Sequence, residues 1–151
     1  MAKPLHTIAD LGAPFWRIVA AGVVKRIKQL TAGGQGVSGR FHAYSDDYRE
    51  AKAGGEFKRQ SSTSSRPNLM LTGDMMRDLK VIKVDKNGAQ VGWSAFGDRM
   101  RYNADKGRAI STEDQALHSG IERWIFKEID KKVESNIKAA RVTKRVPVRV
   151  I

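Results

Sequence analysis

Glycines at a spacing typical of nucleotide-binding loops are the first residues that could carry chemistry. The run Gly34-x-Gly36-x-x-Gly39 formally matches a dinucleotide fingerprint. That fingerprint requires a strand before the glycines and a helix after them, so that the helix N-terminus faces the pyrophosphate. Here the preceding residues predict a helix, and no Gly-Lys-Ser/Thr follows that would indicate a P-loop. We therefore expect no nucleotide site in this segment and interpret residues 33–39 as a flexible loop.

Candidates for acid–base or metal chemistry are few. His6, His42 and His118 are dispersed, without the spacing of a metal site. Cysteine is absent, which excludes thiolate ligands, disulfides and a cysteine nucleophile, and suits a reducing compartment. The pairs Asp46-Asp47 and Glu113-Asp114 lie at predicted helix starts, where the helix dipole favours acidic side chains. We expect a protein that is not an enzyme and that holds no metal or cofactor.

Positive charge is the strongest feature of the composition. The chain has 28 Lys and Arg against 16 Asp and Glu, a formal net charge of +12. From Arg123 to the C-terminus nine Lys and Arg face only three acids, and a second cluster comprises Lys52, Lys58, Arg59 and Arg66. Such charge is either a solvated surface or a contact for phosphates, which attract Lys and Arg without regard to sequence. The candidates for contact with DNA are Lys131, Lys132, Lys138, Arg141, Lys144 and Arg145.

The N-terminal part predicts an amphipathic helix from Phe15 to Leu30. Its apolar residues recur every three or four positions, Pro14 suits its first turn, and Gly33-Gly34 ends it. We expect this helix to pack on a core, with a membrane-surface helix as the less favoured alternative. The longest uncharged apolar stretch in the chain has seven residues, too few to cross a bilayer, and no secretion signal is evident. We therefore expect a soluble protein that is intracellular when made.

The middle of the chain predicts short helices and one hairpin. Ser45 is a good N-cap for a helix that reaches about Ala53, and the polar segment 54–67 is interpreted as a mobile loop. Asn87-Gly88 between two strand-like runs is a strong signal for a β-hairpin, because both turn residues need positive φ. The remaining predicted elements are a short helix capped by Thr72 with Met75, Met76 and Leu79 on its apolar side, strands over 81–86 and 89–93, and a short helix from Arg99 to Ala104.

A long C-terminal helix is predicted to begin at Thr112, where Thr112-Glu113-Asp114-Gln115 has capping-box spacing. Its apolar residues step mainly by four, and each such step advances about 40° beyond a full turn. Leu117 and Trp124 therefore point away from Val133 and Ile137. Either the helix breaks near Asp130, or something else, such as a neighbouring subunit, covers its C-terminal half.

The fold class expected from these elements is α+β. With 151 residues, the chain predicts one domain over residues 1–140. Residues 141–151 alternate valines with basic residues around Pro147, which is typical of an extended arm.

The order of several short motifs resembles a known family. Gly39-Arg40-Phe41-His42-Ala43-Tyr44-Ser45 with Tyr48 precedes Leu69-x-Leu71-Thr72-Gly73-Asp74-Met75-Met76-x-x-Leu79. The predicted hairpin, Val91-Gly92-Trp93 and Asn103-x-x-x-Gly107-Arg108 follow. This order is similar to that of the virion-morphogenesis or tail-completion proteins of tailed bacteriophages, over roughly Val37 to Lys138.

The resemblance implies a structural subunit of the phage head–tail joining region, or neck. Such proteins are α+β subunits that assemble as homo-oligomeric rings around the DNA channel and join the connector to the tail. The implied partners are other copies of the chain, the portal or adaptor, and a tail terminator or tail tube protein. The implied location is the virion, after synthesis in the host cytoplasm.

Ring assembly predicts an interface on the apolar residues of the C-terminal part. We place the main oligomer contacts on Ile129, Val133, Ile137, Val146, Val148 and Val150. The alternative is a small basic protein that binds nucleic acid without sequence specificity, as a monomer or dimer.

Overall fold

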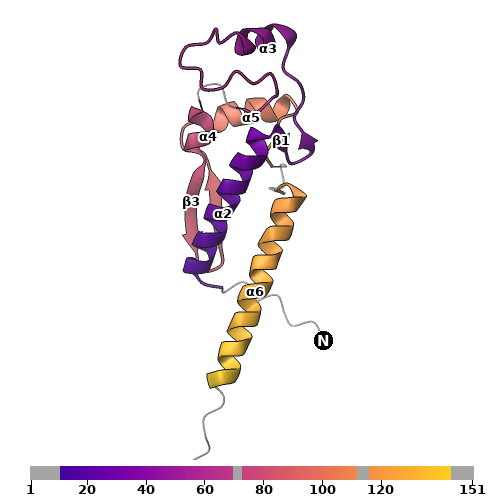
Figure 1. Ribbon diagram of the computed structural model, residues 1–151. Coiled ribbons are helices and arrows are strands. Elements are labelled where there is room, and N and C mark those ends of the chain that lie inside the picture. The colour runs from indigo at the N-terminus through magenta and orange to yellow at the C-terminus, as the bar shows by residue number, and fades with distance from the viewer. Residues whose placement is uncertain (1–10, 70–72, 112–115, 144–151) are drawn as a thin grey trace, which may run out of the picture.

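The computed structural model describes residues 11–69, 73–111 and 116–143. Within these ranges the chain forms five helices and two antiparallel hairpins, which confirms the expected α+β class (Figure 1). The elements in chain order are α2 (Ala13–Ala32), β1 (Gln35–Gly36), β2 (Gly39–Arg40), α3 (Asp46–Ala53), α4 (Asp74–Asp78), β3 (Lys80–Asp85), β4 (Gly88–Gly92), α5 (Gly97–Asp105) and α6 (Ser119–Thr143).

Helix α2 is the central element of the body. It contacts the β3–β4 hairpin on one side and α6 on the other (Figure 1). Val19, Val23 and Ile27 recur every fourth residue and are buried, and each contributes roughly 1.5–3 kcal/mol through the apolar surface it removes from water. Pro14 lies in the first turn and Gly33 caps the C-terminus, so the predicted helix and its two ends are confirmed.

The predicted hairpin is confirmed, but its turn is shifted by one residue. Asp85 pairs with Gly88, so the turn consists of Lys86 and Asn87 rather than Asn87 and Gly88. The carboxylate of Asp85 accepts a hydrogen bond from the Asn87 backbone N–H at 2.8 Å, and neither Asn87 nor Gly88 has positive φ. The side chain before the turn therefore stabilises it without the left-handed backbone that Asn-Gly favours. The register also shifts between Val81 and Lys83, which is characteristic of a β-bulge.

Residues 33–39, interpreted from the sequence as a flexible loop, form most of the β1–β2 hairpin, which ends at Arg40, so that interpretation is corrected. Gly36 pairs with Gly39 across a two-residue turn. The N–H of Val37 donates to the carbonyl of Ala109 at 3.0 Å, and that of Phe41 donates to the carbonyl of Gly34 at 2.9 Å. Glycine is required at position 36, because a Cβ there would lie closer than 3.0 Å to the oxygen of Ala109. Gly36 thus allows the β1–β2 hairpin to pack closely against Ala109.

Three short helices complete the end of the molecule drawn at the top of Figure 1. The side chain of Ser45 accepts a hydrogen bond from the Tyr48 N–H at the start of α3, which confirms the predicted cap. Gly73, in the left-handed conformation, precedes α4, and the predicted cap Thr72 lies outside the described residues. Met75, Met76 and Leu79 are buried as expected. The third helix, α5, is longer than the predicted 99–104.

The long C-terminal helix begins later and ends later than the sequence predicts. Residues 112–115 lie outside the described residues, but Ala116 to His118 are not helical, so a start at Thr112 is wrong. The carbonyl of His118 instead accepts hydrogen bonds from Ile121 and Glu122, and the Glu122 carboxylate accepts one from the N–H of Leu117 at 3.0 Å. Helix α6 then runs unbroken to Thr143, which excludes a break near Asp130 and puts 141–143 in the helix rather than in an arm.

Candidate functional site

The first half of α6 packs on the body of the protein. Ile121 is 2% exposed, and Trp124 and Ile125 pack against the core. The guanidinium of Arg26 in α2 lies 3.6 Å from the centroid of the Trp124 ring. Beyond these residues α6 continues as a rod that extends past the start of α2 (Figure 1).

The second half of α6 carries an apolar stripe on a different face. At about 100° per residue, Phe126 lies about 160° around the helix from Trp124, and Val133 and Ile137 lie within about 20° of Phe126. Phe126 is 64% exposed and Ile137 is 38% exposed. Ile129 and Val133 are partly buried. We call Phe126, Ile129, Val133 and Ile137 the α6 stripe. It contains three predicted interface residues; Val146, Val148 and Val150 lie outside the described residues.

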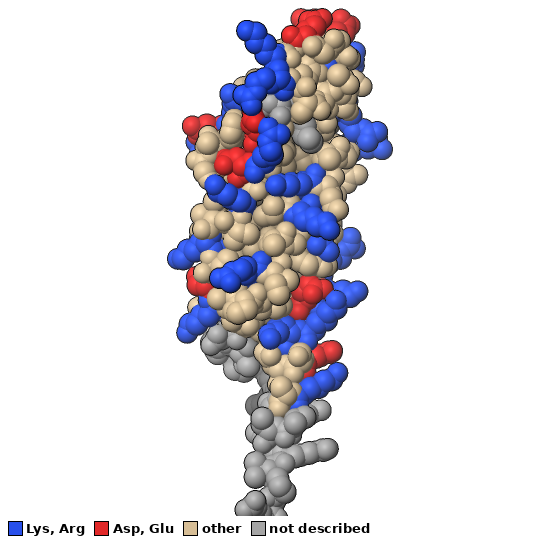
Figure 2. All heavy atoms as spheres, turned by 60° about the vertical axis from the view of Figure 1, so that its left-hand side comes forward, with Lys and Arg blue, Asp and Glu red and all other residues tan. Residues whose placement is uncertain are grey.

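The predicted DNA-facing cations do not form one uniform group. Lys131 pairs with Glu128 of the same helix at 2.8 Å. Within the described part of the chain, no ion pair involves Lys132 or Lys138. The side chain of Arg141 and residues Lys144 and Arg145 lie outside what the structure describes. Figure 2 shows Lys and Arg along the whole length of one face, with acidic side chains between them, so positive charge on this face is not confined to α6.

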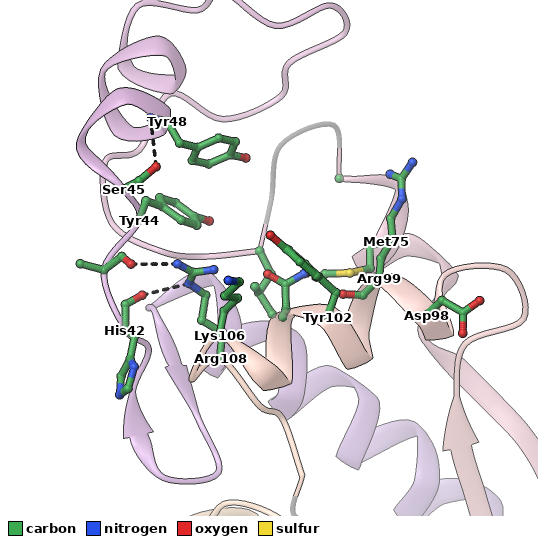
Figure 3. Close-up of a pocket in the computed structure, with 14 residues that line it drawn as sticks. His42, Tyr44, Ser45, Tyr48, Met75, Asp98, Arg99, Tyr102, Lys106 and Arg108 are labelled. Carbon is green, nitrogen blue, oxygen red and sulfur yellow. Dashed lines mark hydrogen bonds between the residues drawn. The ribbon is translucent and has the colours of Figure 1, made fainter.

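A second candidate site is a hollow of about 950 Å³ between α3 and α5, which we call the α3–α5 hollow (Figure 3). Tyr44 and Tyr48 form one wall, and their rings lie edge to face with centroids 4.7 Å apart. The opposite wall comes from α5, where Arg99, Tyr102 and Lys106 occupy one helical face. Tyr102 is 63% exposed, and the Nζ of Lys106 lies 5.7 Å from its ring centroid.

Arg108 forms the floor of the α3–α5 hollow. Its Nε donates to the carbonyl of His42 at 3.0 Å, and its Nη2 donates to that of Ala43 at 2.8 Å. The side chain is 9% exposed, and Cζ lies 4.8 Å from the centroid of the Tyr44 ring. Arg108 therefore fixes the chain that leads into α3 and places a positive charge beside the tyrosines.

Lys52 is fully buried behind Tyr44, although the sequence suggested that it belongs to an exposed basic cluster. Its Nζ donates to the side-chain oxygen of Asn68 at 2.8 Å and to the hydroxyl of Tyr44 at 3.5 Å. Burial lowers the pKa of the Lys52 ammonium to about 8. Gln60 donates to the backbone carbonyl of Lys52, so that the segment after α3 folds back over the lysine. The prediction of a basic surface at position 52 is therefore wrong.

Electrostatics also acts on the tyrosines of the hollow. Burial raises the pKa of Tyr48, and the neighbouring Tyr44 adds to this effect, whereas Arg108 opposes it. Tyr48 therefore remains a neutral hydroxyl at physiological pH, and the charge of this wall comes from the cations alone.

Of the residues considered for catalysis, His42 and His118 have contacts in the structure, and His6, Glu113 and Asp114 lie outside the described residues. The imidazole of His42 lies against Gly107, where a Cβ would overlap it, and Nδ1 of His118 accepts a hydrogen bond from the N–H of Gly120 at 3.1 Å. No group of three His, Asp or Glu among the described residues could hold a metal ion. None of the described helices combines the length and apolar character that crossing a membrane requires.

Sequence reasoning missed the α3–α5 hollow. Tyr44 and Tyr48 four residues apart were a signal, because such a pair shares one side of a helix start. The residues of α5 come from a segment more than 50 positions further along the chain.

Comparison with protein-family models, curated proteins and solved structures finds no match for this chain.

Proposed function

We propose that this chain is a structural subunit of the head–tail joining region of a tailed bacteriophage, in which copies form a ring around the DNA channel. The α6 stripe carries this proposal. Phe126, Val133 and Ile137 lie about 140–180° around α6 from Trp124, which packs on the chain's own core, and Phe126 and Ile137 are exposed. The order of the motifs along the chain supplies the link to the phage family.

The physical reason for assembly is the cost of leaving such a stripe in water. Large apolar side chains in a row on an exposed helix favour contact with another surface. A second copy of the chain offers that surface at high local concentration inside an assembling particle. One head-to-tail contact, repeated with a rotation that closes, produces a ring. Lys132 and Lys138 lie beside the stripe and can contact DNA phosphates without reading sequence.

Sedimentation velocity over a concentration series tests the assembly. We expect the wild-type chain to form a closed oligomer, and the double variant Phe126→Gln, Ile137→Gln to sediment as a monomer with an unchanged circular dichroism spectrum. The matched control is Ile82→Gln, because Ile82 is an apolar side chain 51% exposed on β3, on the other side of α2 from α6 (Figure 1). A wild-type chain that remains a monomer at every concentration contradicts the proposal.

Particle imaging tests the phage role. In purified virions of a phage that encodes this chain, we expect ring-shaped density for it between head and tail. The competing reading, a small basic nucleic-acid-binding protein, predicts no incorporation into particles. It also predicts that the monomer binds duplex DNA with an affinity that falls steeply with salt.

A further inference from the structure

The α3–α5 hollow lies at the opposite end of the molecule from the free half of α6, and the proposed assembly does not use it (Figure 1). One of the residues that line it, Arg108 in its floor, is a buried cation. Arg108 forms no ion pair with a carboxylate in the described ranges. A buried charge without a counter-charge is costly, and a bound anion reduces that cost.

The open side of the hollow adds two more cations. Arg99 and Lys106 extend from α5, and no ion pair within the described segments involves either of them. Asp98 is the acidic residue at the rim, but its side chain points away from the hollow (Figure 3), where it pairs with Arg101 at 3.5 Å. The inner surface is therefore positive.

Aromatic rings distinguish this hollow from a simple anion site. Tyr102 is exposed between Arg99 and Lys106 on the face of α5 that lines it, with Tyr48 on the opposite wall (Figure 3). A volume of about 950 Å³ is far larger than a bare phosphate needs and lies within the range of sites for organic ligands. Base–aromatic stacking beside cations that hold the phosphate is the usual mode of binding single-stranded nucleic acid.

We propose that the α3–α5 hollow binds a nucleoside phosphate, either as a free nucleotide or as part of a single strand, with the base stacked on Tyr102 and the phosphate held by Lys106 and Arg108. An acidic peptide shares the negative charge but not the flat aromatic surface that an exposed tyrosine recognises, so the lining favours the nucleotide. This inference does not rest on the proposed ring, because every residue in it lies outside α6.

Calorimetric titration of the full chain at low salt tests the proposal. The probes are thymidine monophosphate, the single strand (dT)8, inorganic phosphate and hexaglutamate. We expect the first two to bind. If (dT)8 binds more tightly than the monophosphate, the ligand of the hollow is a single strand. If the monophosphate binds at least as tightly, the ligand is a free nucleotide.

Two variants locate the site. Tyr102→Ala should weaken binding about tenfold, which is the size of one lost base–aromatic stack. Lys106→Gln should weaken it by a smaller factor. Both side chains are exposed, so neither change threatens the fold. Arg17→Gln is the matched control, because Arg17 is an exposed cation on α2 away from the hollow, and it should leave the affinity unchanged.

Three results would overturn the assignment. Inorganic phosphate binding as tightly as the nucleotide would mean that no base is recognised. Hexaglutamate binding more tightly than both nucleotide probes would make the hollow a site for acidic peptides. An affinity unchanged in Tyr102→Ala, or no binding of any nucleotide probe, would remove the stacking on which the proposal depends.

Discussion

The indole of Trp124 in α6 occupies the space beside Gly22 in α2 that the Cβ of any other residue would fill. Three atoms of the ring lie within 3.1 Å of that Cβ position. The guanidinium of Arg26 lies over the same ring, and it also donates to the carbonyl of Gly22 at 3.2 Å. A glycine in the middle of a helix is unfavourable by itself, so its presence here reflects the close approach of α6.

The first prediction concerns this contact. Gly22→Ala should lower the free energy of unfolding by about 1–3 kcal/mol, because overpacking outweighs the gain in helix propensity. In a Trp124→Ala background the same change should raise it by about 1 kcal/mol, since only the propensity remains. A double-mutant cycle by urea unfolding measures the difference. Equal effects in both backgrounds would mean that the two helices do not meet at this point.

The second prediction concerns the β1–β2 hairpin. Gly36→Ala should lower the free energy of unfolding by at least about 2 kcal/mol, because the new Cβ overlaps the oxygen of Ala109 and the ring of Phe41. Gly97→Ala, at the start of α5 with open space around it, should be neutral or slightly stabilising. Thermal unfolding of both variants checks the contrast. A tolerated alanine at position 36 would show that the hairpin does not pack against 109.

The third prediction concerns Asp78 at low pH. The hydrogen bond from the N–H of Ala95, at 2.8 Å, holds the pKa of Asp78 below its usual range, with help from Phe96. Because the folded-state pKa is depressed, this stabilisation is present above a pH of about 4 and is lost as the pH falls through the folded-state value. Asp78→Asn should therefore have a lower free energy of unfolding than wild type at pH 7. The difference between the two free energies should become smaller as the pH falls.

Urea unfolding at pH 7, 4 and 3 tests that narrowing. Asp98→Asn serves as the control, because Asp98 is exposed and forms only a surface pair with Arg101. A gap between wild type and Asp78→Asn that stays constant across this range would contradict the assignment.

The fourth prediction concerns Lys52 at high pH. Its pKa is about 8 in the folded chain, against about 10.5 when unfolded, so the unfolded state binds more protons between these values. Wild-type stability should therefore rise with pH in this window relative to Lys52→Met, which has no proton to lose. Lys58→Met, at an exposed lysine, should show the same change of the free energy of unfolding with pH as wild type. If Lys52→Met also showed the wild-type pH dependence, the Lys52 ammonium would be solvated in the folded chain.

The fifth prediction concerns the free half of α6. Side chains 134–139 are exposed, so a chain that ends at Val133 should keep a melting temperature within about 3 °C of wild type. The same truncation should abolish the oligomer in sedimentation velocity, because it removes Ile137. Unfolding of the truncated chain would instead place the missing segment in the chain's own core.

Local signals in the sequence predicted the elements whose ends are set by their own residues. The Pro14 and Gly33 boundaries of α2 and the Ser45 cap of α3 are of this kind. Positions fixed by distant partners were predicted wrongly. Gly36 is packed by Ala109, over seventy positions away, and Lys52 is buried by Asn68 and the returning segment around Gln60. The start of α6 was placed at a good capping box, but the chain uses His118 and Glu122 instead.

The divergent faces of α6 were predictable because helical geometry alone determines them. The sequence left open whether the helix breaks or continues, since nothing near Asp130 distinguishes the two. The two walls of the α3–α5 hollow could not be brought together from the sequence, because only tertiary packing places α3 and α5 on either side of it.

The contact between Gly22 and Trp124 also determines the direction in which the rest of α6 extends. About 19 residues, or roughly 28 Å of helix, separate Trp124 from Thr143 at the end of the rod. A tilt of about 5° at the indole would thus displace the far end by about 2.5 Å. In the proposed ring, a small tilt at this contact would change the radius at which neighbouring α6 helices meet. Copies of one sequence would then fit partner rings of different diameter.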